Sequence, residues 1–198
     1  MSVLWILGQA RSGKSELAEE IFPLLPGKKF YIGTLPRTPE NMRTIKKHVD
    51  QRPEDWELIE ITDKLDVATE SIGRSSKNQV IATLLDGWGV YARCRASQWG
   101  KDNTELTTDG ETIFVDGIYS EYRRLVRICD YLIIVAHVSA HPPAASDYES
   151  DRTTSRVRAV TSRCIAEADK VIYHDVEDVS HKDRGYVEQI AGEMIARN

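Results

Sequence analysis

Short apolar runs alternate with longer amphipathic or polar stretches along the whole chain. Six apolar runs of five to nine residues are typical of buried strands, and they cover residues 3–7, 29–33, 56–61, 79–87, 130–137 and 170–174. The stretches between and after them have helical spacing or helix-favouring composition, which predicts helices over residues 14–25, 39–50, 65–74, 111–129, 154–168 and 186–197. Because strands and helices alternate, we expect an α/β fold with a mostly parallel sheet and helices on both faces.

Nothing in the pattern divides the chain, since there is neither an internal repeat nor a linker. Residues 1–198 are therefore predicted to form a single domain. Two polar stretches, 95–110 and 139–151, are expected to be loops that are long for a compact domain. Loops of this length are either lids over a functional site or surface excursions without a role, and the pattern leaves both open.

Composition narrows the class of protein. Of the 198 residues, 41% are hydrophobic and 29% are charged, which is ordinary for a globular domain, and the net charge of −5 argues against a broad nucleic-acid surface. The longest strongly apolar run, residues 131–136, is far shorter than the ~18–20 residues of a membrane span, and the N-terminus has no basic leader. Three widely spaced cysteines, Cys94, Cys129 and Cys164, favour buried free thiols over a disulfide framework. We therefore expect a cytoplasmic protein that neither spans a membrane nor binds nucleic acid.

The stretch GQARSGKS, directly after the first apolar run, fits the phosphate-binding pattern Gly-x-x-x-x-Gly-Lys-Ser and precedes a predicted helix. Backbone N–H groups of such a loop surround a phosphate chain, and the helix N-terminus adds positive potential. The sequence thus predicts a P-loop NTPase fold of the RecA-like kind. The predicted nucleotide-binding residues are Gly8, Gln9, Ala10, Arg11, Ser12, Gly13, Lys14 and Ser15.

Within this loop, Lys14 is expected to reach the β- and γ-phosphates and act in catalysis, and the Ser15 hydroxyl to bind Mg²⁺. Asp86 closes the fourth apolar run and is the candidate second magnesium residue; the alternative is a simple turn residue before Gly87. The chain has no Asn-Lys-x-Asp guanine signature and is too short for an ordinary motor module, so a Ras-like switch and a helicase are disfavoured.

Two stretches in the first third of the chain carry a family resemblance. The first is the loop itself, with its Arg11-Ser12 pair; the second runs from residue 31 to residue 60. Together they resemble the bifunctional adenosylcobinamide kinase/adenosylcobinamide-phosphate guanylyltransferase family of cobalamin assembly. The matching positions of the second stretch are Tyr31, Ile32, Thr34, Glu40, Ile45, His48, Arg52, Pro53, Trp56 and Glu60, with Gly33 in place of an alanine.

The resemblance implies a kinase that uses ATP or GTP with Mg²⁺, and a guanylyltransferase in which His48 takes GMP from GTP. Neutral imidazole can attack an α-phosphate and expel pyrophosphate, and Lys47 and Arg52 would supply positive charge. The alternative is that His48 only provides favourable charge at a helix C-terminus. The resemblance also implies a homo-oligomer, a trimer in the family, built by helices near the histidine.

The second half departs from the family pattern. Gly87, Trp88 and Gly89 follow Asp86 where the family has a cysteine and a threonine, and residues 137–151 lack its glycine pair. An arginine helix is partly kept, and its members could clamp phosphates or form a solvated face: Arg152, Arg156 and Arg163. Trp56 and Trp88 could stack on a base or pack in the core, and metal at His137 and His141 is disfavoured because spacing places no third ligand.

Two rival functions therefore stay open beside the bifunctional one. One is a P-loop kinase with another acceptor, such as a nucleoside or other small alcohol, and no guanylyl transfer. The other is a nucleotide-binding module without enzymatic activity, which the combination of Lys14, Ser15 and Asp86 disfavours.

Overall fold

The computed structural model describes the chain except for residues 51, 62, 76–77, 103–107, 138–147 and 175–182. The side chains at positions 44, 47–48, 50, 101–102, 108–109 and 148–152 also lie outside the description.

A six-stranded, wholly parallel sheet forms the centre of the molecule, with the strand order β3-β2-β4-β5-β1-β6. The middle strands read as continuous apolar runs because helices cover both faces of the sheet. The six predicted strands are all present, with ends that differ by one or two residues. They are β1 (Ser2–Gly8), β2 (Lys28–Gly33), β3 (Glu57–Glu60), β4 (Ile81–Asp86), β5 (Tyr131–His137) and β6 (Lys170–Tyr173).

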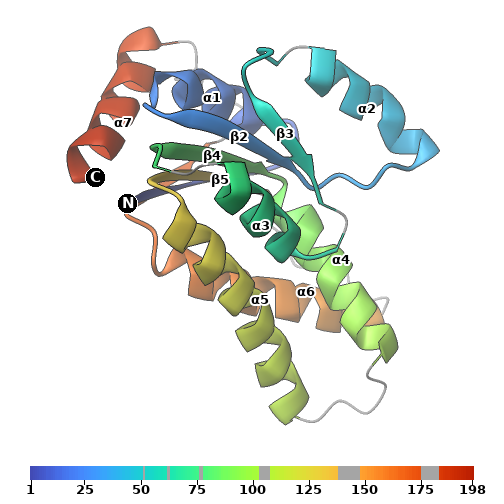
Figure 1. Ribbon diagram of the computed structural model, residues 1–198. Coiled ribbons are helices and arrows are strands. Elements are labelled where there is room, and N and C mark those ends of the chain that lie inside the picture. Colours follow the sequence, from blue (N-terminus) through green and yellow to red (C-terminus); the bar gives the residue numbers. More distant parts are fainter. Residues whose placement is uncertain (51, 62, 76–77, 103–107, 138–147, 175–182) are drawn as a thin grey trace.

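Helices pack on both faces of the sheet, as the alternating pattern predicted (Figure 1). On one face lie α1 (Lys14–Ile21) and α7 (Arg184–Arg197), whose apolar residues share a core with one side of the strands. On the other face lie α3 (Leu65–Ser75), α4 (Trp88–Asp102), α5 (Thr108–Ile128) and α6 (Tyr148–Ile165). In Figure 1, α2 (Pro39–Asp50) stands away from both layers, beyond one end of the sheet.

The expected loop over residues 95–110 is wrong, because α4 continues to Asp102 and α5 begins at Thr108. The buried residues of α4 recur every three to four positions (Trp88, Tyr91, Ala92 and Ala96), but small and polar residues between them hide the period in the sequence. The second expected loop, 139–151, is wrong at its end, since α6 begins at Tyr148; residues 139–147 lie outside the described residues.

Two smaller expectations also need correction. The helix predicted over residues 14–25 ends at Ile21 and continues as a 3-10 turn, η1 (Phe22–Leu24), with Pro23 at its start, where a missing N–H costs least. Cys94 is exposed rather than buried, whereas Cys129 and Cys164 are buried free thiols as predicted.

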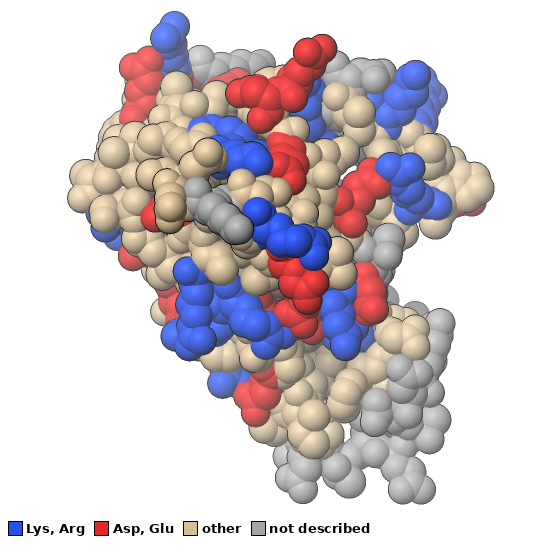
Figure 2. Space-filling view, viewed as in Figure 1, with Lys and Arg blue, Asp and Glu red and all other residues tan. Residues whose placement is uncertain are grey.

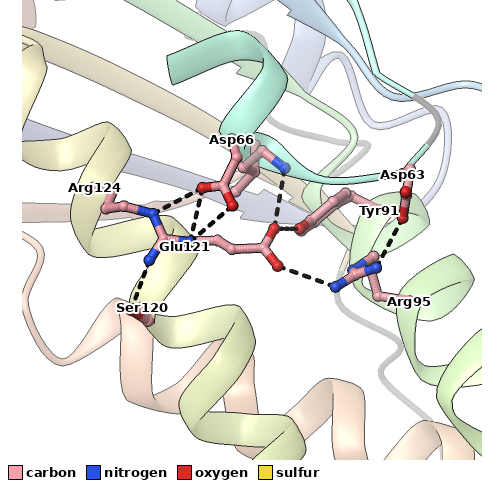
Figure 3. Close-up of polar contacts among 8 residues, drawn as sticks. Asp63, Asp66, Tyr91, Arg95, Ser120, Glu121 and Arg124 are labelled. Carbon is pink, nitrogen blue, oxygen red and sulfur yellow. Dashed lines mark hydrogen bonds and ion pairs between the residues drawn. The ribbon is translucent and has the colours of Figure 1, made fainter. Parts of the chain in front are cut away.

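A buried carboxylate joins three helices on the second face (Figure 3). Glu121 of α5 accepts hydrogen bonds from the backbone N–H of Leu65, at 3.0 Å, and from the hydroxyl of Tyr91. It also pairs with Arg95 of α4 at 3.0 Å. Because the first N–H groups of a helix lack intrahelical partners, Glu121 caps α3 from a neighbouring helix and fixes α3, α4 and α5 relative to one another.

Candidate functional site

The phosphate-binding loop connects β1 to α1 at the edge where the carboxyl ends of the strands meet. The first residue of the loop, Gly8, leaves no room for a side chain, because a Cβ at this position would lie 2.0 Å from the carbonyl oxygen of His174. Arg11 and Gly13 have left-handed backbone angles, with φ of 61° and 89°. These reversals bring the chain round to α1, which begins at Lys14.

Lys14 lies folded over this loop. Its Nζ donates a hydrogen bond to the carbonyl oxygen of Gln9 and lies 3.5 Å from Oγ of Ser12. Burial lowers the pKa of Lys14, and the carboxylate of Asp86 opposes that shift. A buried ammonium that contacts only neutral oxygens and a nearby carboxylate charge is stabilised further by an anionic partner, so this position suits the phosphate contact predicted for it.

Asp86 and Ser15, predicted from separate parts of the sequence, lie together. The Ser15 hydroxyl donates to Oδ1 of Asp86 at 3.1 Å, and the Tyr31 hydroxyl donates to Oδ2 at 2.7 Å. Parallel pairing explains both contacts. Strands β2 and β4 end in register, with Gly33 beside Asp86, and β5 pairs with both β4 and β1, which brings the end of β4 and the loop before Ser15 to the same edge of the sheet. Asp86 is therefore more than a turn residue before Gly87.

A hydroxyl and a carboxylate are the oxygen donors that Mg²⁺ prefers, and Mg²⁺ is usually held by one or two protein side chains together with phosphates and water. Ser15 and Asp86 thus fit the predicted magnesium site, and their role in it stays a prediction. The described residues include no cluster of three or more histidine, cysteine or carboxylate side chains that could hold a metal by itself.

Tyr31 and Thr34 are polar partners of Asp86 that received no role from the sequence. Thr34 is buried, and its hydroxyl lies 3.1 Å from the carbonyl oxygen of Asp86 and 2.8 Å from that of Gly87. Burial, and then the Asp86 charge, raise the pKa of Tyr31 well above its usual value, which keeps its proton on the hydroxyl that donates to Asp86. Their place in the Tyr-Ile-Gly-Thr stretch at a strand end was the signal that could have identified them.

Beside Asp86 lies a pocket of about 210 Å³ whose walls come from the ends of β2, β3 and β4 and from α2. Arg52 lines it and stacks on Tyr31, with its guanidinium carbon 3.4 Å from the ring centroid. Glu60 and Thr34 add polar groups, while Leu35, Ile45, Leu58 and Val90 add apolar ones. The structure thus brings Arg52 to the pocket next to the predicted magnesium residue; its contact with phosphate stays a prediction.

The predicted nucleophile, His48, belongs to the last turn of α2, and Lys47 precedes it. Both side chains lie outside the described residues. The helix reaches the pocket at Ile45, and Arg52, two residues beyond the end of the helix, lines the pocket as well, so lining residues lie on either side of His48 in the sequence.

His137 ends β5 and pairs in register with Gly8 at the start of the phosphate-binding loop. Partial burial lowers its pKa, and the charges of Lys14 and Arg93 add to the effect. His141 lies outside the described residues.

Arg156 and Arg163 of α6 line a pocket between α5 and α6 and not the pocket at Asp86, and their contact with phosphate stays a prediction. Arg156 is buried between α5 and α6, which contradicts a solvated face, and Arg163 pairs with Asp116 and stacks on Tyr119. The side chain of Arg152 lies outside the described residues.

Both tryptophans considered for stacking contribute to packing. Trp88 is fully buried, its ring meets that of Trp5 edge-on at 5.4 Å, and its indole N–H donates to Thr161, so it cannot stack on a base. Trp56 packs against Phe22 and Tyr31.

Two of the solved structures to which the chain is similar are ATPases of type III secretion systems. The assembled ATPase EscN of the enteropathogenic E. coli type III secretion system matches 78% of this chain with 14% identity and a TM-score of 0.50. A prototypical ATPase from the type III secretion system of pathogenic bacteria matches 78%, also with 14% identity, with a TM-score of 0.49. The chain spans only 40% and 48% of these two proteins. At this identity, the first likeness supports the predicted RecA-like fold and nothing beyond it.

No curated protein sequence matches the chain. No helix among the described residues is long and apolar enough to cross a membrane.

A family model described as cobinamide kinase / cobinamide phosphate guanyltransferase matches residues 4–119, which include the phosphate-binding loop, Asp86 and the helix that carries His48. This match extends over more than half of the sequence, and the chain therefore belongs to the cobinamide kinase/cobinamide phosphate guanyltransferase family.

Proposed function

We propose that the protein transfers the γ-phosphoryl group of a nucleoside triphosphate to a hydroxyl group of cobinamide, and then transfers GMP from GTP to the product. The observation that carries the first step is the Ser15–Asp86 hydrogen bond at 3.1 Å beside the buried Lys14. It brings together, at one end of the sheet, a hydroxyl, a carboxylate and an ammonium of the types that phosphoryl transfer needs.

In the kinase step, the loop N–H groups and Lys14 hold the β- and γ-phosphates. Ser15 and Asp86 would hold Mg²⁺, which when bound neutralises charge that develops on the phosphate oxygens. The Tyr31 hydroxyl keeps the Asp86 carboxylate in one orientation through its 2.7 Å hydrogen bond. The acceptor hydroxyl attacks the γ-phosphorus, the bond to the bridging oxygen breaks, and the nucleoside diphosphate leaves.

The pocket lined by Arg52 and Glu60 is where we expect the acceptor or the second nucleotide to bind. It is next to Asp86, and it joins apolar walls to a cation and a carboxylate, which suits a ligand with both polar and apolar parts. Arg52 offers its guanidinium to phosphate oxygens while the Tyr31 ring supports its flat face.

In the guanylyl step, His48 Nε2 or Nδ1 attacks the α-phosphorus of GTP, pyrophosphate leaves, and a phosphoramidate forms. A phosphate oxygen of the acceptor then attacks that phosphorus and releases the histidine. Two residues of the same segment, Ile45 and Arg52, line the pocket and thereby support a place for His48 near it.

We also expect a homo-oligomer, a trimer if the family pattern holds, and a cytoplasmic location. Support for the oligomer comes from α2, which stands outside both layers and exposes Met42 and Val49. Apolar side chains of this size gain stability when a neighbouring subunit covers them.

The test uses GTP labelled at the α-phosphate, Mg²⁺, and three proteins: the wild type, His48→Asn and Lys14→Ala. We expect acid-labile label on denatured wild-type protein and none on His48→Asn, while Lys14→Ala loses phosphorylation of cobinamide from γ-labelled triphosphate. Label that persists on His48→Asn would contradict the nucleophile. Cobinamide phosphorylation that survives Lys14→Ala would contradict the kinase site.

Two observations favour a second candidate, a kinase with another small alcohol as acceptor. The family match ends at residue 119, and Gly87, Trp88 and Gly89 replace the residues that the family pattern leads one to expect after Asp86. Turnover of nucleoside triphosphate with a panel of nucleosides and alcohols, but not with cobinamide, would establish that candidate.

A further inference from the structure

A second pocket, of about 360 Å³, lies between α5 and α6 and shares no residue with the phosphate-binding loop or with the pocket at Asp86. Its lining combines charged, hydroxyl and aliphatic side chains: Glu111, Thr112, Val115, Ser155, Arg156, Ala159 and Arg163. It is therefore a separate feature on the face of the sheet opposite to α1 and α7.

Arg156 is the unusual member of this lining. Its side chain is only 4% exposed, yet its Nε and Nη2 atoms have no hydrogen-bond partner within the part of the chain that the structure describes. The carboxylate of Glu111 is 3.9 Å from Nη2, beyond hydrogen-bond distance, and is half exposed. A buried guanidinium with unsatisfied donors is costly, so an acceptor at this place would stabilise it considerably.

The two unsatisfied atoms share one edge of the guanidinium. Nε and Nη2 donate their hydrogens in parallel, with the spacing of two oxygens of a carboxylate or phosphate. One oxyanion can therefore satisfy both donors at once, whereas a neutral acceptor would satisfy one.

The other arginine of the pocket is already engaged. Arg163 lines the pocket, but it hydrogen-bonds to Asp116, and its guanidinium carbon lies 4.0 Å from the Tyr119 ring centroid. Val115 and Ala159 provide aliphatic surface, and Ser155 provides a hydroxyl at the rim. The volume exceeds what one inorganic anion needs, which leaves space for an organic group attached to it.

We propose that this pocket binds a small organic oxyanion, a phosphate monoester or a carboxylate, through a bidentate contact with Arg156. The ligand's oxygens take the Nε–Nη2 edge, its organic part lies on Val115 and Ala159, and Glu111 moves away from the guanidinium. The site is independent of the proposed kinase and guanylyl steps and exists whether or not these occur.

The experiment is calorimetric titration of the full chain, with the nucleotide site kept saturated by magnesium and a non-hydrolysable triphosphate. Glycerol phosphate and butyrate are the two probes, and the one that binds more tightly shows whether the pocket prefers a phosphate monoester or a carboxylate. We expect Arg156→Gln to weaken binding at least roughly tenfold, because two hydrogen bonds to a charged group are lost. Arg156→Lys keeps the positive charge but loses the two parallel N–H donors of the guanidinium, so it should weaken binding nearly as much as Arg156→Gln.

Glu111→Gln gives a prediction of the opposite sign. It removes the carboxylate that competes for Arg156, so binding should tighten about two- to fivefold, the range of a partly exposed ion pair. Arg158→Gln is the matched control, since Arg158 lies exposed on the same helix, and it should leave binding unchanged. Circular dichroism of each variant separates loss of binding from loss of folding, and Glu111→Gln keeps the proposal testable if Arg156→Gln fails to fold.

Three results would overturn the proposal. Neither probe binds the wild type, or Arg158→Gln weakens binding as much as Arg156→Gln, or Glu111→Gln weakens binding instead of strengthening it. If the probes fail and Arg156→Gln changes the sedimentation of the protein, the pocket is a contact between copies of the chain.

Discussion

The hydrogen bond from Tyr31 to Asp86 offers a direct test of how the site is held together. Tyr31→Phe removes one hydroxyl and keeps the ring against which Arg52 and Trp56 pack. The hydroxyl is 2.7 Å from Oδ2 of Asp86, and Tyr31 is 1% exposed, so the lost contact is short and charge-assisted. Such bonds contribute about 1.5–3 kcal/mol.

Asp86 is only partly buried, so water can take the place of the missing hydroxyl. We therefore expect Tyr31→Phe to lower the free energy of unfolding by about 1–2 kcal/mol, toward the low end of that range. For a chain of this length, that corresponds to a fall in Tm of roughly 3–6 °C. Because the carboxylate can then rotate, the KM for magnesium nucleotide should rise about three- to tenfold.

The pH dependence of stability in the wild type and in Tyr31→Phe provides a second test, because the direction of the change is predicted. The pKa of Tyr31 is raised in the folded state, so the folded protein keeps the proton at a pH where the unfolded chain has lost it. This contribution to stability is complete below about pH 10, the usual tyrosine pKa, and is lost as the pH rises further. The stability difference between the wild type and Tyr31→Phe should therefore shrink above about pH 10.

Urea denaturation and nucleotide titration, each with Tyr173→Phe as control, provide the measurements. Tyr173 is 72% exposed, and its substitution should change neither quantity. The reasoning is refuted if Tyr31→Phe and Tyr173→Phe have the same free energy of unfolding and the same nucleotide affinity, because the Tyr31 hydroxyl would then not orient Asp86.

Three further predictions concern the loop, a buried carboxylate and a buried thiol. Gly8→Ala forces a Cβ against the His174 carbonyl and should lower stability by about 1–3 kcal/mol and abolish tight nucleotide binding in a fluorescence titration, whereas Gly192→Ala, with open space around it, should do neither. Glu121→Ala leaves three donors unpaired and should cost about 3–5 kcal/mol in urea denaturation; a cost below 1 kcal/mol would contradict the capping role. Burial raises the pKa of Cys129 to about 12, so stability should fall as the pH rises from about 9 to 12, and Cys129→Ala should make that slope shallower in denaturation curves.

Much of the fold follows from local sequence pattern. The apolar runs of β1, β4 and β5 are continuous because both faces of the sheet are covered, and that continuity identifies them without a structure. The pattern does not reveal helix α4, for the complementary reason. It touches the core with aromatic and small residues, and Gly89 and Gly100 give it the appearance of a loop.

The candidate site was predictable where a short motif carries its own geometry. The glycines of the loop, Lys14 and Ser15 are adjacent in sequence, and Asp86 ends a strand whose carboxyl end lies at the same edge of the sheet. The partnership of Tyr31 with Asp86 was not predictable, because it depends on the register between β2 and β4.

The sequence by itself determined the strand-and-helix alternation, the phosphate-binding loop and the family. Each of these can be recognised from the types and spacing of residues that are close together along the chain. Only the tertiary structure decided which side chains far apart along the chain meet. It brought Tyr31 and Ser15 to the two oxygens of Asp86, it buried Glu121 under the start of α3, and it enclosed Arg156 between two helices. The physical reason is that a contact between distant residues depends on strand order, register and helix packing, which arise from the free energy of the whole fold and not from any single segment.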